Sequence, residues 1–273
     1  MTSSTLPDRG TARSAIRWFV HGIGSLGGVV VVLLLAELST RTDLLPSRFL
    51  PPPTETFATL FELLGGATAW IAIAETLRSW ALGLLIAVLA GVLLGLVVGA
   101  NELAYRATRP IVEFLRPVPS VALIPLVFLL FADNLSGGTV FLAAFASLWP
   151  MLVQTTYGIR NVMPTQVDTA RSFQIRRMDV ALRVVLPSAI PYIATGVRIA
   201  STVALILVLT GEIVVGAGGI GQQINEARQG SAVAAMYAYV LLAGILGVIL
   251  NALFAAVERR MLRWHPSHRE ASE

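Results

Sequence analysis

Residues 81–99 read ALGLLIAVLAGVLLGLVVG, nineteen residues without a charged side chain. A helix of about twenty predominantly apolar residues spans the ~30 Å hydrocarbon core of a bilayer. The apolar run reaches back to residue 71, so the stretch 71–99 is longer than a bilayer needs. We therefore predict a membrane-spanning helix whose first turns, with Glu75 and Arg78, tilt or project beyond the outer surface.

The composition of the whole chain agrees with that stretch. Hydrophobic residues make up 55% of the 273 residues and charged residues 13%, with a mean hydropathy of +0.74. A soluble domain is about one quarter charged, because its core needs a charged shell. Here the charges are too few to supply that shell, and no Pro/Ser/Gly-rich stretch divides the interior into two domains. The sequence predicts an all-α membrane protein.

Five further apolar runs complete a set of six predicted spans: 18–38, 110–131, 138–158, 190–215 and 232–257. The arginine-rich start before residue 18 could belong to a cleaved signal peptide. The run behind it is long enough to cross the bilayer, however, and Ser39-Thr40-Arg41 is not a small-x-small cleavage site. We therefore expect a retained first helix. Six crossings place both termini on the same side of the membrane.

The segment between the first two spans has a different character. Residues 45–53 read LPSRFLPPP and cannot be helical, because proline removes backbone donors and restricts the residue before it. We expect an extended outer loop there, followed by a short amphipathic helix over residues 54–65.

Arginine placement fixes the predicted orientation. All 20 basic residues are arginines, and with the N-terminus inside, the inner segments hold fourteen of them. The outer segments hold only Arg41, Arg48 and Arg228. Because positive residues favour the cytoplasmic side, both termini are expected in the cytoplasm. The net charge of +4 does not indicate nucleic-acid binding, since the arginines lie between apolar runs without aromatic platforms.

These features divide the chain into four parts. Residues 1–17 are a cytoplasmic tail, residues 18–69 are the first span with the outer loop and its short helix, residues 70–258 are the core, and residues 259–273 are a cytoplasmic C-terminal tail.

The longest inner segment away from the termini, residues 160–188, is predicted to be structured. Pro164 and Thr165 open a helix, and Thr165-Gln-Val-Asp168 fits a capping box. Beyond Gln174 an apolar stripe recurs at helical spacing, and Pro187 and Pro191 are expected to end that helix. The stripe consists of Met178, Ala181, Leu182, Val185 and Leu186. A helix resting on acidic lipid and a docking helix fit this pattern about equally.

The spacing within this loop carries a family resemblance. Asp168-Thr169-Ala170 is followed by three residues, Gln174, nine residues and Val184-Val185-Leu186-Pro187. This resembles the Glu-Ala-Ala, Gly and Ile-x-Leu-Pro motif in the coupling loop of the permease subunits of binding-protein-dependent ABC importers. The resemblance covers about residues 70–258. It includes Arg116-Pro-Val-Pro119, Pro125 and Gly211-Glu212, and it is closest to the nitrate, sulfonate and taurine importers.

The resemblance implies an assembly in the bacterial inner membrane with the type I importer fold. Two permease chains surround the path, two cytoplasmic ATPases bind ATP and Mg, and an extracytoplasmic binding protein delivers the solute. The second permease chain is expected to be an identical copy, and a different chain stays open as the alternative. This chain then needs no cofactor, contacts lipid and partner proteins, and carries a small organic or inorganic anion such as a sulfonate or nitrate. The implied ATPase-coupling residues are Asp168, Thr169, Ala170, Phe173, Gln174, Leu186 and Pro187.

Three residues depart from the family motif: Asp168 replaces Glu, Thr169 replaces Ala and Gln174 replaces Gly. The last has the largest consequence, because glycine permits a left-handed turn that costs another residue about 1–2 kcal/mol. Either the turn is a different one here or the docking geometry is altered.

Candidate path residues are polar groups or helix breakers at membrane depth. Ionisable groups there usually face a bundle interior or a wet cavity, but Arg198 and Glu212 could equally snorkel or satisfy a broken helix end. Polar side chains such as Gln154 and Tyr157 more often join helices. Prolines 117, 119 and 125 are expected to break the third span. The candidates are Gln154, Tyr157, Arg198, Glu212, Pro119 and Pro125.

Glycine patterns suggest structure rather than ligand binding. Gly216-Ala-Gly218-Gly219-Ile-Gly221 satisfies the GxGxxG pattern, but it follows a membrane span and not a strand of a βαβ unit. A tight turn is the better interpretation. The glycines at 91, 95 and 99 predict close helix packing.

Other function classes fit less well. An intramembrane enzyme needs a Ser–His pair or clustered ligands, whereas His21, His265 and His268 lie near the termini and cysteine is absent. A self-contained secondary transporter or channel would not need the structured inner loop, and a transporter would usually show a repeat. The sequence has no Walker A motif, so ATP-driven transport requires a separate ATPase.

Overall fold

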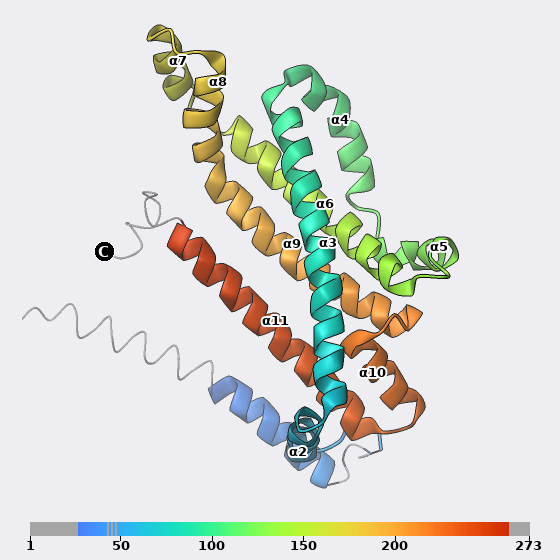
Figure 1. The fold of residues 1–273 in the computed structure, drawn as a ribbon. Coiled ribbons are helices and arrows are strands. Elements are labelled where there is room, and N and C mark those ends of the chain that lie inside the picture. Colours follow the sequence, from blue (N-terminus) through green and yellow to red (C-terminus); the bar gives the residue numbers. More distant parts are fainter. Residues whose placement is uncertain (1–26, 43, 45, 47, 262–273) are drawn as a thin grey trace, which may run out of the picture.

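The computed structural model describes residues 27–42, 44, 46 and 48–261, and all regular structure among them is helical. The helices form an elongated bundle, with α7 and α8 at one end and α2 and α10 at the other (Figure 1). We call these the α7 end and the α10 end. Residues 27–41 are helical, and the elements after them are α2 (Pro53–Leu64), α3 (Ala67–Ala100), α4 (Glu102–Leu115), the 3₁₀ helix η1 (Ser120–Leu123), α5 (Ile124–Leu130), α6 (Leu135–Arg160), α7 (Pro164–Ser172), α8 (Arg177–Val180), the π-helical turn η2 (Ala181–Val185), α9 (Leu186–Val215), α10 (Gly219–Gln229) and α11 (Val233–Met261).

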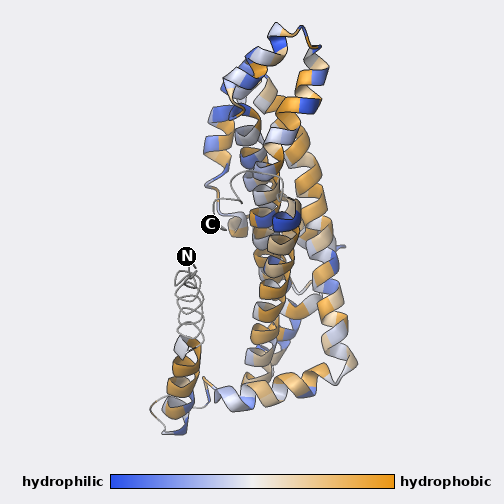
Figure 2. Cartoon of the chain, turned by 90° about the vertical axis from the view of Figure 1, so that its left-hand side faces the viewer, coloured by the Kyte–Doolittle hydropathy of each residue, from blue (hydrophilic) through white to orange (hydrophobic). Residues whose placement is uncertain are grey.

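Four described helices are long and apolar enough to cross a membrane: α3, α6, the helix Met178–Val215 that contains α9, and α11. They correspond to the second, fourth, fifth and sixth predicted spans. Figure 2 shows apolar residues along these helices and hydrophilic residues gathered at the α7 end. The first part of the first predicted span, the whole N-terminal tail and most of the C-terminal tail lie outside the described residues.

The third predicted span is broken, as its prolines predict. The pair α4 and η1–α5 passes the same test only as a bent unit, with an 80° angle between its halves. Helix α4 ends at Leu115, just before Pro117 and Pro119, and Pro125 lies in the first turn of α5. The predicted start at residue 110 was wrong, because α4 begins at Glu102 and carries Pro110 within it.

The core is built by α3 packed on α6 and by α6 packed on α9. Glycines of α3 permit this close approach. A Cβ added at Gly91 would lie 2.7 Å from Met151 Cβ, and one added at Gly95 would lie 2.5 Å from Thr155 Cβ. Both separations are far below van der Waals contact, so a larger residue would push the helices apart. The predicted role of these glycines in helix packing is confirmed.

The helix that contains α9 runs without interruption from Met178 to Val215, so the prediction that Pro187 and Pro191 end it was wrong. The π-helical turn η2 explains the continuity. There the Leu186 N–H donates to the Ala181 carbonyl five residues earlier. This wider turn lies where a proline ring would otherwise meet the preceding turn. The helix therefore continues through Pro187, and Pro191 lies within α9.

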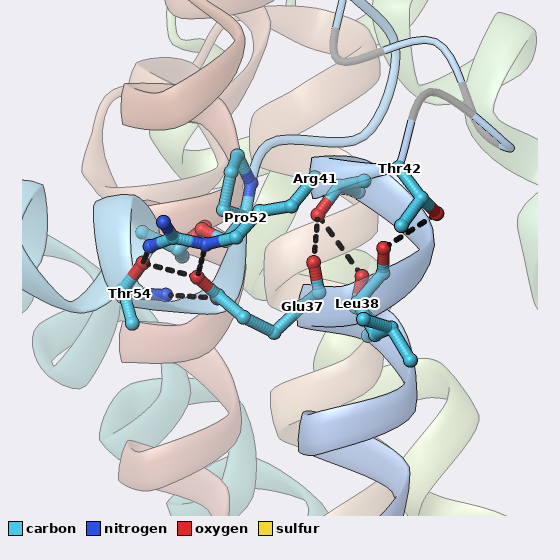
Figure 3. Close-up of polar contacts among 9 residues, drawn as sticks. Glu37, Leu38, Arg41, Thr42, Pro52 and Thr54 are labelled. Carbon is cyan, nitrogen blue, oxygen red and sulfur yellow. Dashed lines mark hydrogen bonds and ion pairs between the residues drawn. The ribbon is translucent and has the colours of Figure 1, made fainter.

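The helix 27–41 is joined to α2 by Glu37 and Arg41, which both bond to Thr54 (Figure 3). Pro52 precedes α2 and offers no capping side chain. Glu37 supplies the cap: its carboxylate accepts from Thr54 N at 3.1 Å and from Thr54 Oγ1 at 2.8 Å. Arg41 Nε donates to the same carboxylate at 2.6 Å. Helix α2 covers the residues for which a short helix is predicted.

Candidate functional site

At the α7 end, α7 and α8 form a hairpin around one left-handed residue. Gln174 has a φ of 55°. The Ile175 N–H donates to the Ala170 carbonyl at 3.1 Å, and the Gln174 N–H donates to the Arg171 carbonyl at 2.8 Å. This pair of bonds is the Schellman ending of a helix, in which glycine is the favoured left-handed residue. Gln174 therefore takes the conformation that glycine would allow, and the turn is not a different one.

The residues of the predicted coupling motif lie at different depths in this hairpin. Ala170 is buried, whereas Phe173 is 76% exposed at the turn. Asp168 lies on the exposed side of α7, 3.7 Å from the Arg171 guanidinium. Thr169 donates to the Thr165 carbonyl at 2.7 Å within the same helix. The hairpin thus combines a buried small residue with an exposed aromatic one.

The two halves of the predicted loop face each other. An open groove of about 510 Å³ is lined by Thr165 and Thr169 from α7 and by Val184 and Pro187 from η2 and α9. Leu186 and Pro187 open α9 and continue directly from the hairpin. In the apolar stripe, Met178 is 70% exposed and Leu182 is 56% exposed, so no described residue covers that part of it.

The predicted capping box of α7 was wrong. The helix begins at Pro164, and its N-cap is Met163, which makes no side-chain cap. Because a proline forces the residue before it into an extended conformation, the helix starts one residue before Thr165. Thr165 therefore lies inside the first turn, where its side chain cannot act as an N-cap.

At the α10 end, three side chains from α3 and α9 bind the start of α10. Glu212 is 1% exposed, and its Oε2 accepts from Thr76 Oγ1 and from Gly221 N, each at 2.9 Å. Thr76 Oγ1 in turn accepts from Ile220 N at 2.9 Å, and Glu75 Oε2 accepts from Gly219 N at 2.8 Å. The first amides of a helix have no partner within it, so these side chains act as its cap.

The turn into α10 needs glycine, as its sequence predicts. Gly216 ends α9 with a φ of 72°, and Gly218 and Gly219 have φ values of 89° and 82°. A Cβ on Gly219 would collide with the Glu212 carboxylate. The GxGxxG pattern is therefore a tight turn against a buried glutamate.

The predicted path residues do not gather in one place. Arg198 pairs with Glu258 of α11 at 3.3 Å and contacts Asn251 Oδ1 at 3.3 Å, away from Glu212. Gln154 packs against α9 at Gly196.

The remaining path candidates lie elsewhere in the bundle. Tyr157 meets the edge of Tyr192 at a centroid distance of 5.4 Å and lines a cavity beside α4. Pro119 and Pro125 are exposed at the break between α4 and α5.

Sequence reasoning missed Thr76 and the wall of the cavity beside α4. Thr76 lies 136 positions from Glu212, and no local pattern links them. The wall did leave a signal: Tyr105, Arg109, Val112 and Arg116 recur every three or four residues, which places their side chains on one helix face. Among the described residues, no group of three or more His, Cys, Asp or Glu could hold a metal.

Comparisons with known proteins agree with this architecture. The chain is 31% identical to the nitrate import permease protein NrtB of Leptolyngbya laminosa over 70% of this chain and 68% of that one. It is 29% identical to the taurine transport system permease protein TauC of Escherichia coli over 88% and 89%. It is 30% identical to the putative aliphatic sulfonates transport permease protein SsuC of Escherichia coli over 88% and 90%.

Solved structures share the fold. A chain of a bacterial ABC transporter involved in the import of the acidic polysaccharide alginate has a TM-score of 0.61 at 16% identity, covering 93% of this chain and 99% of that one. A chain of an amino acid ABC transporter has a TM-score of 0.60 at 19% identity, covering 69% and 92%. Residues 87–263 match the family described as binding-protein-dependent transport system inner membrane component. The chain belongs to this family of ABC importer permeases, in the group of the nitrate, sulfonate and taurine systems.

Proposed function

We propose that this chain is the permease subunit of an ATP-driven importer for a small organic or inorganic anion. Two copies surround the solute path, a separate ATPase dimer binds the α7 end in the cytoplasm, and a binding protein delivers solute at the α10 end. Both termini are then cytoplasmic, and residues 70–258 form the core of the transport unit. The relatives support the solute class, since their names specify nitrate, taurine, aliphatic sulfonates and bicarbonate.

The α7–α8 hairpin is the observation that carries the proposal. It extends from the end of the bundle (Figure 1) and presents the exposed Phe173 beside the left-handed Gln174. An exposed aromatic side chain next to an apolar stripe is typical of a surface completed by a partner protein. Its family position supports the ATPase as that partner.

The helix behind the hairpin supports a rigid transmission of motion. Met178–Val215 is one helix of 38 residues, which at 1.5 Å per residue is about 57 Å long. It begins in the hairpin, continues through Leu186 and Pro187, and ends just past Glu212, which holds α10. A displacement of the hairpin by closing ATPases therefore reaches the opposite end as rigid-body rocking.

The burial of Ala170 provides the test. Replacing it with arginine forces a long charged side chain into a buried position of the hairpin, which must rearrange to admit it. We expect Ala170→Arg to lose uptake in proteoliposomes that contain the whole complex, while the bound ATPase no longer responds to the loaded binding protein. Ala170→Ser keeps the small size and should retain both activities. Unchanged uptake by Ala170→Arg would overturn the coupling role.

A second arm tests the partner itself. We expect a P-loop ATPase to copurify with the tagged chain from its native membrane and to be lost from Phe173→Glu. Phe61→Glu is the matched control, since Phe61 is 72% exposed against 76% for Phe173 but lies at the α10 end. Recovery of the chain alone, without ATPase activity, would favour a secondary transporter or channel.

A further inference from the structure

A cavity of about 460 Å³ lies between α3, α4 and α6 toward the α7 end. Val98 of α3 and Leu152 of α6 line it and are buried, while α4 supplies the opposite wall. The cavity is large enough for a small solute or a lipid headgroup, and Tyr157 is the only path candidate from the sequence that lines it.

The charges around this cavity are unbalanced. Arg109, Arg116 and Arg160 line it, against one carboxylate, Glu113. Arg109 Nε already donates to Glu113 Oε1 at 2.7 Å. Arg116, the C-cap residue of α4, has no ion-pair partner among the described residues. At least one guanidinium in this cavity therefore has no counter-charge within the described chain.

Arg160, which lines the cavity, is held in a fixed position. Its guanidinium carbon lies 3.8 Å from the centroid of the Tyr105 ring, within the range of a cation–π interaction. One of its terminal nitrogens donates to Glu102 Oε2 at 2.7 Å. An arginine fixed on two sides loses little rotational freedom when it binds a ligand, so this part of the site is preorganised.

A buried hydroxyl in the same cavity has no partner. Thr156 is a buried residue that lines the cavity, and its Oγ1 makes no hydrogen bond to any described residue. Thr155 differs: its hydroxyl donates to the Met151 carbonyl at 2.8 Å, the usual bond within a helix. A buried polar group left unpaired is costly, so the Thr156 hydroxyl is suited to a ligand that accepts a hydrogen bond.

Helix α4 turns its polar side toward this cavity. Tyr105, Arg109 and Arg116 line it, whereas Leu103 and Phe114 on the other side of the helix are 77% and 76% exposed. In a chain that lies in a bilayer, exposed apolar residues meet lipid, while charges face the interior or water. This arrangement is typical of a helix that lines a wet, charged cavity.

We propose that the cavity binds an oxyanion: a carboxylate, sulfonate, nitrate or phosphate group. Arg116 supplies the free charge, Arg160 a fixed second donor, and the Thr156 hydroxyl a hydrogen bond to one oxygen. The guanidinium fork matches the oxygens of such groups. The proposal adds to the proposed function a site at which the permease itself binds anions, and it does not require the ATPase.

Binding to the purified chain tests this site. In nanodiscs of neutral phosphatidylcholine, we expect saturable binding of radiolabelled methanesulfonate and competition by nitrate, with chloride held constant. Arg116→Gln removes the free charge, and Thr156→Val removes the hydroxyl at nearly the same shape. We expect each to weaken binding about tenfold or more, as for the loss of a hydrogen bond to a charged group. Thr155→Val and Arg228→Gln are controls outside the cavity and should bind as the unchanged chain does.

A second arm identifies the source of the oxyanion. The same titration in nanodiscs with phosphatidylglycerol shows whether an acidic headgroup occupies the site. Methanesulfonate binding that persists there supports a free anion, and methanesulfonate binding by the unchanged chain that falls as the phosphatidylglycerol fraction rises supports the headgroup. Absence of saturable binding in both membranes, or binding that neither Arg116→Gln nor Thr156→Val weakens, would overturn the proposal. Because no ATPase is present, its failure is distinct from failure of the Ala170→Arg test.

Discussion

Helices α7 and α10 lie before and after the long helix Met178–Val215, and their first residues are held in opposite ways. Helix α10 begins against Glu75, Thr76 and Glu212, and those side chains satisfy its first amides within the chain. Helix α7 begins after Met163 without a side-chain cap, and the hairpin that it forms exposes Phe173. The start of α10 is therefore satisfied by side chains of this chain, while the hairpin at the α7 end leaves Phe173 exposed.

The C-terminal turns of α7 and α10 are alike, so the difference between the two helices lies at their N-terminal ends. Ser231 after α10 has a φ of 55°, as Gln174 has after α7. The Ser231 N–H donates to the Arg228 carbonyl at 3.2 Å, and the Ala232 N–H donates to the Ala227 carbonyl at 2.9 Å. Both helices thus have a Schellman ending with a non-glycine residue in the left-handed position. The two ends differ in their tertiary contacts and not in local chain geometry. Glu75, Thr76 and Glu212 bind the start of α10 from α3 and α9, and we call these three side chains the clamp.

Removing the clamp should produce the largest effect. Glu212→Ala leaves the Gly221 N–H and the Thr76 hydroxyl without their acceptor and opens a cavity beside Gly219. Each of these two unpaired buried groups costs about 1–3 kcal/mol, so we expect a loss of about 2–6 kcal/mol in unfolding free energy. Thermal unfolding in detergent measures the loss, and hydrogen exchange should rise first in α10.

Glu212→Gln is the matched control for that variant. The amide oxygen can accept both bonds that Oε2 accepts now, and Oε1 has no hydrogen-bond partner to lose. We therefore expect near-normal stability. If Glu212→Gln lowered the unfolding free energy as much as Glu212→Ala, the site would require the negative charge and not the cap. Hydrogen bonds to α10 would then not explain why the two ends differ.

A substitution in the shared scaffold should affect both ends together. Gly95→Ala places a methyl group 2.5 Å from Thr155 Cβ, between α3 and α6. Overpacking a close helix contact costs about 1–3 kcal/mol, and exchange should increase in α7 and α10 alike because both are attached to this scaffold. Gly244→Ala is the control, since nothing lies within 4 Å of a Cβ there. A response confined to one end would show that the two ends are attached independently.

The sequence predicted the helices at the two ends better than the contacts between them. Four of the spans, the proline break and the glycine packing follow from patterns local to the chain, such as the uncharged run in α3. The clamp could not be predicted, because it joins Thr76 and Glu212 from helices far apart in the sequence. Their pairing depends on how α3 packs against α9 and on the turn at Gly216.

The wrong predictions at the α7 end have local causes in the chain. The continuity of the helix through Pro187 depends on the π-helical turn before it, which apolar periodicity does not reveal. The failed capping box came from placing the helix start at Thr165 when Pro164 sets it one residue earlier. At Gln174 the motif spacing predicts the turn correctly and the residue type does not, because the chain keeps the left-handed conformation without the glycine.

The smallest expected effect compares the two left-handed turns directly. Gln174→Gly and Ser231→Gly each relieve a conformation that costs a non-glycine residue about 1–2 kcal/mol, partly offset by the greater freedom of glycine in the unfolded chain. We expect each to raise the unfolding free energy by about 0.5–1 kcal/mol. Gln174→Gly should also leave uptake intact, because the turn keeps its shape. A gain at Ser231 together with lost uptake from Gln174→Gly would show that the glutamine side chain itself contacts the partner at the α7 end, and docking rather than backbone geometry would then explain why this residue replaces the motif glycine.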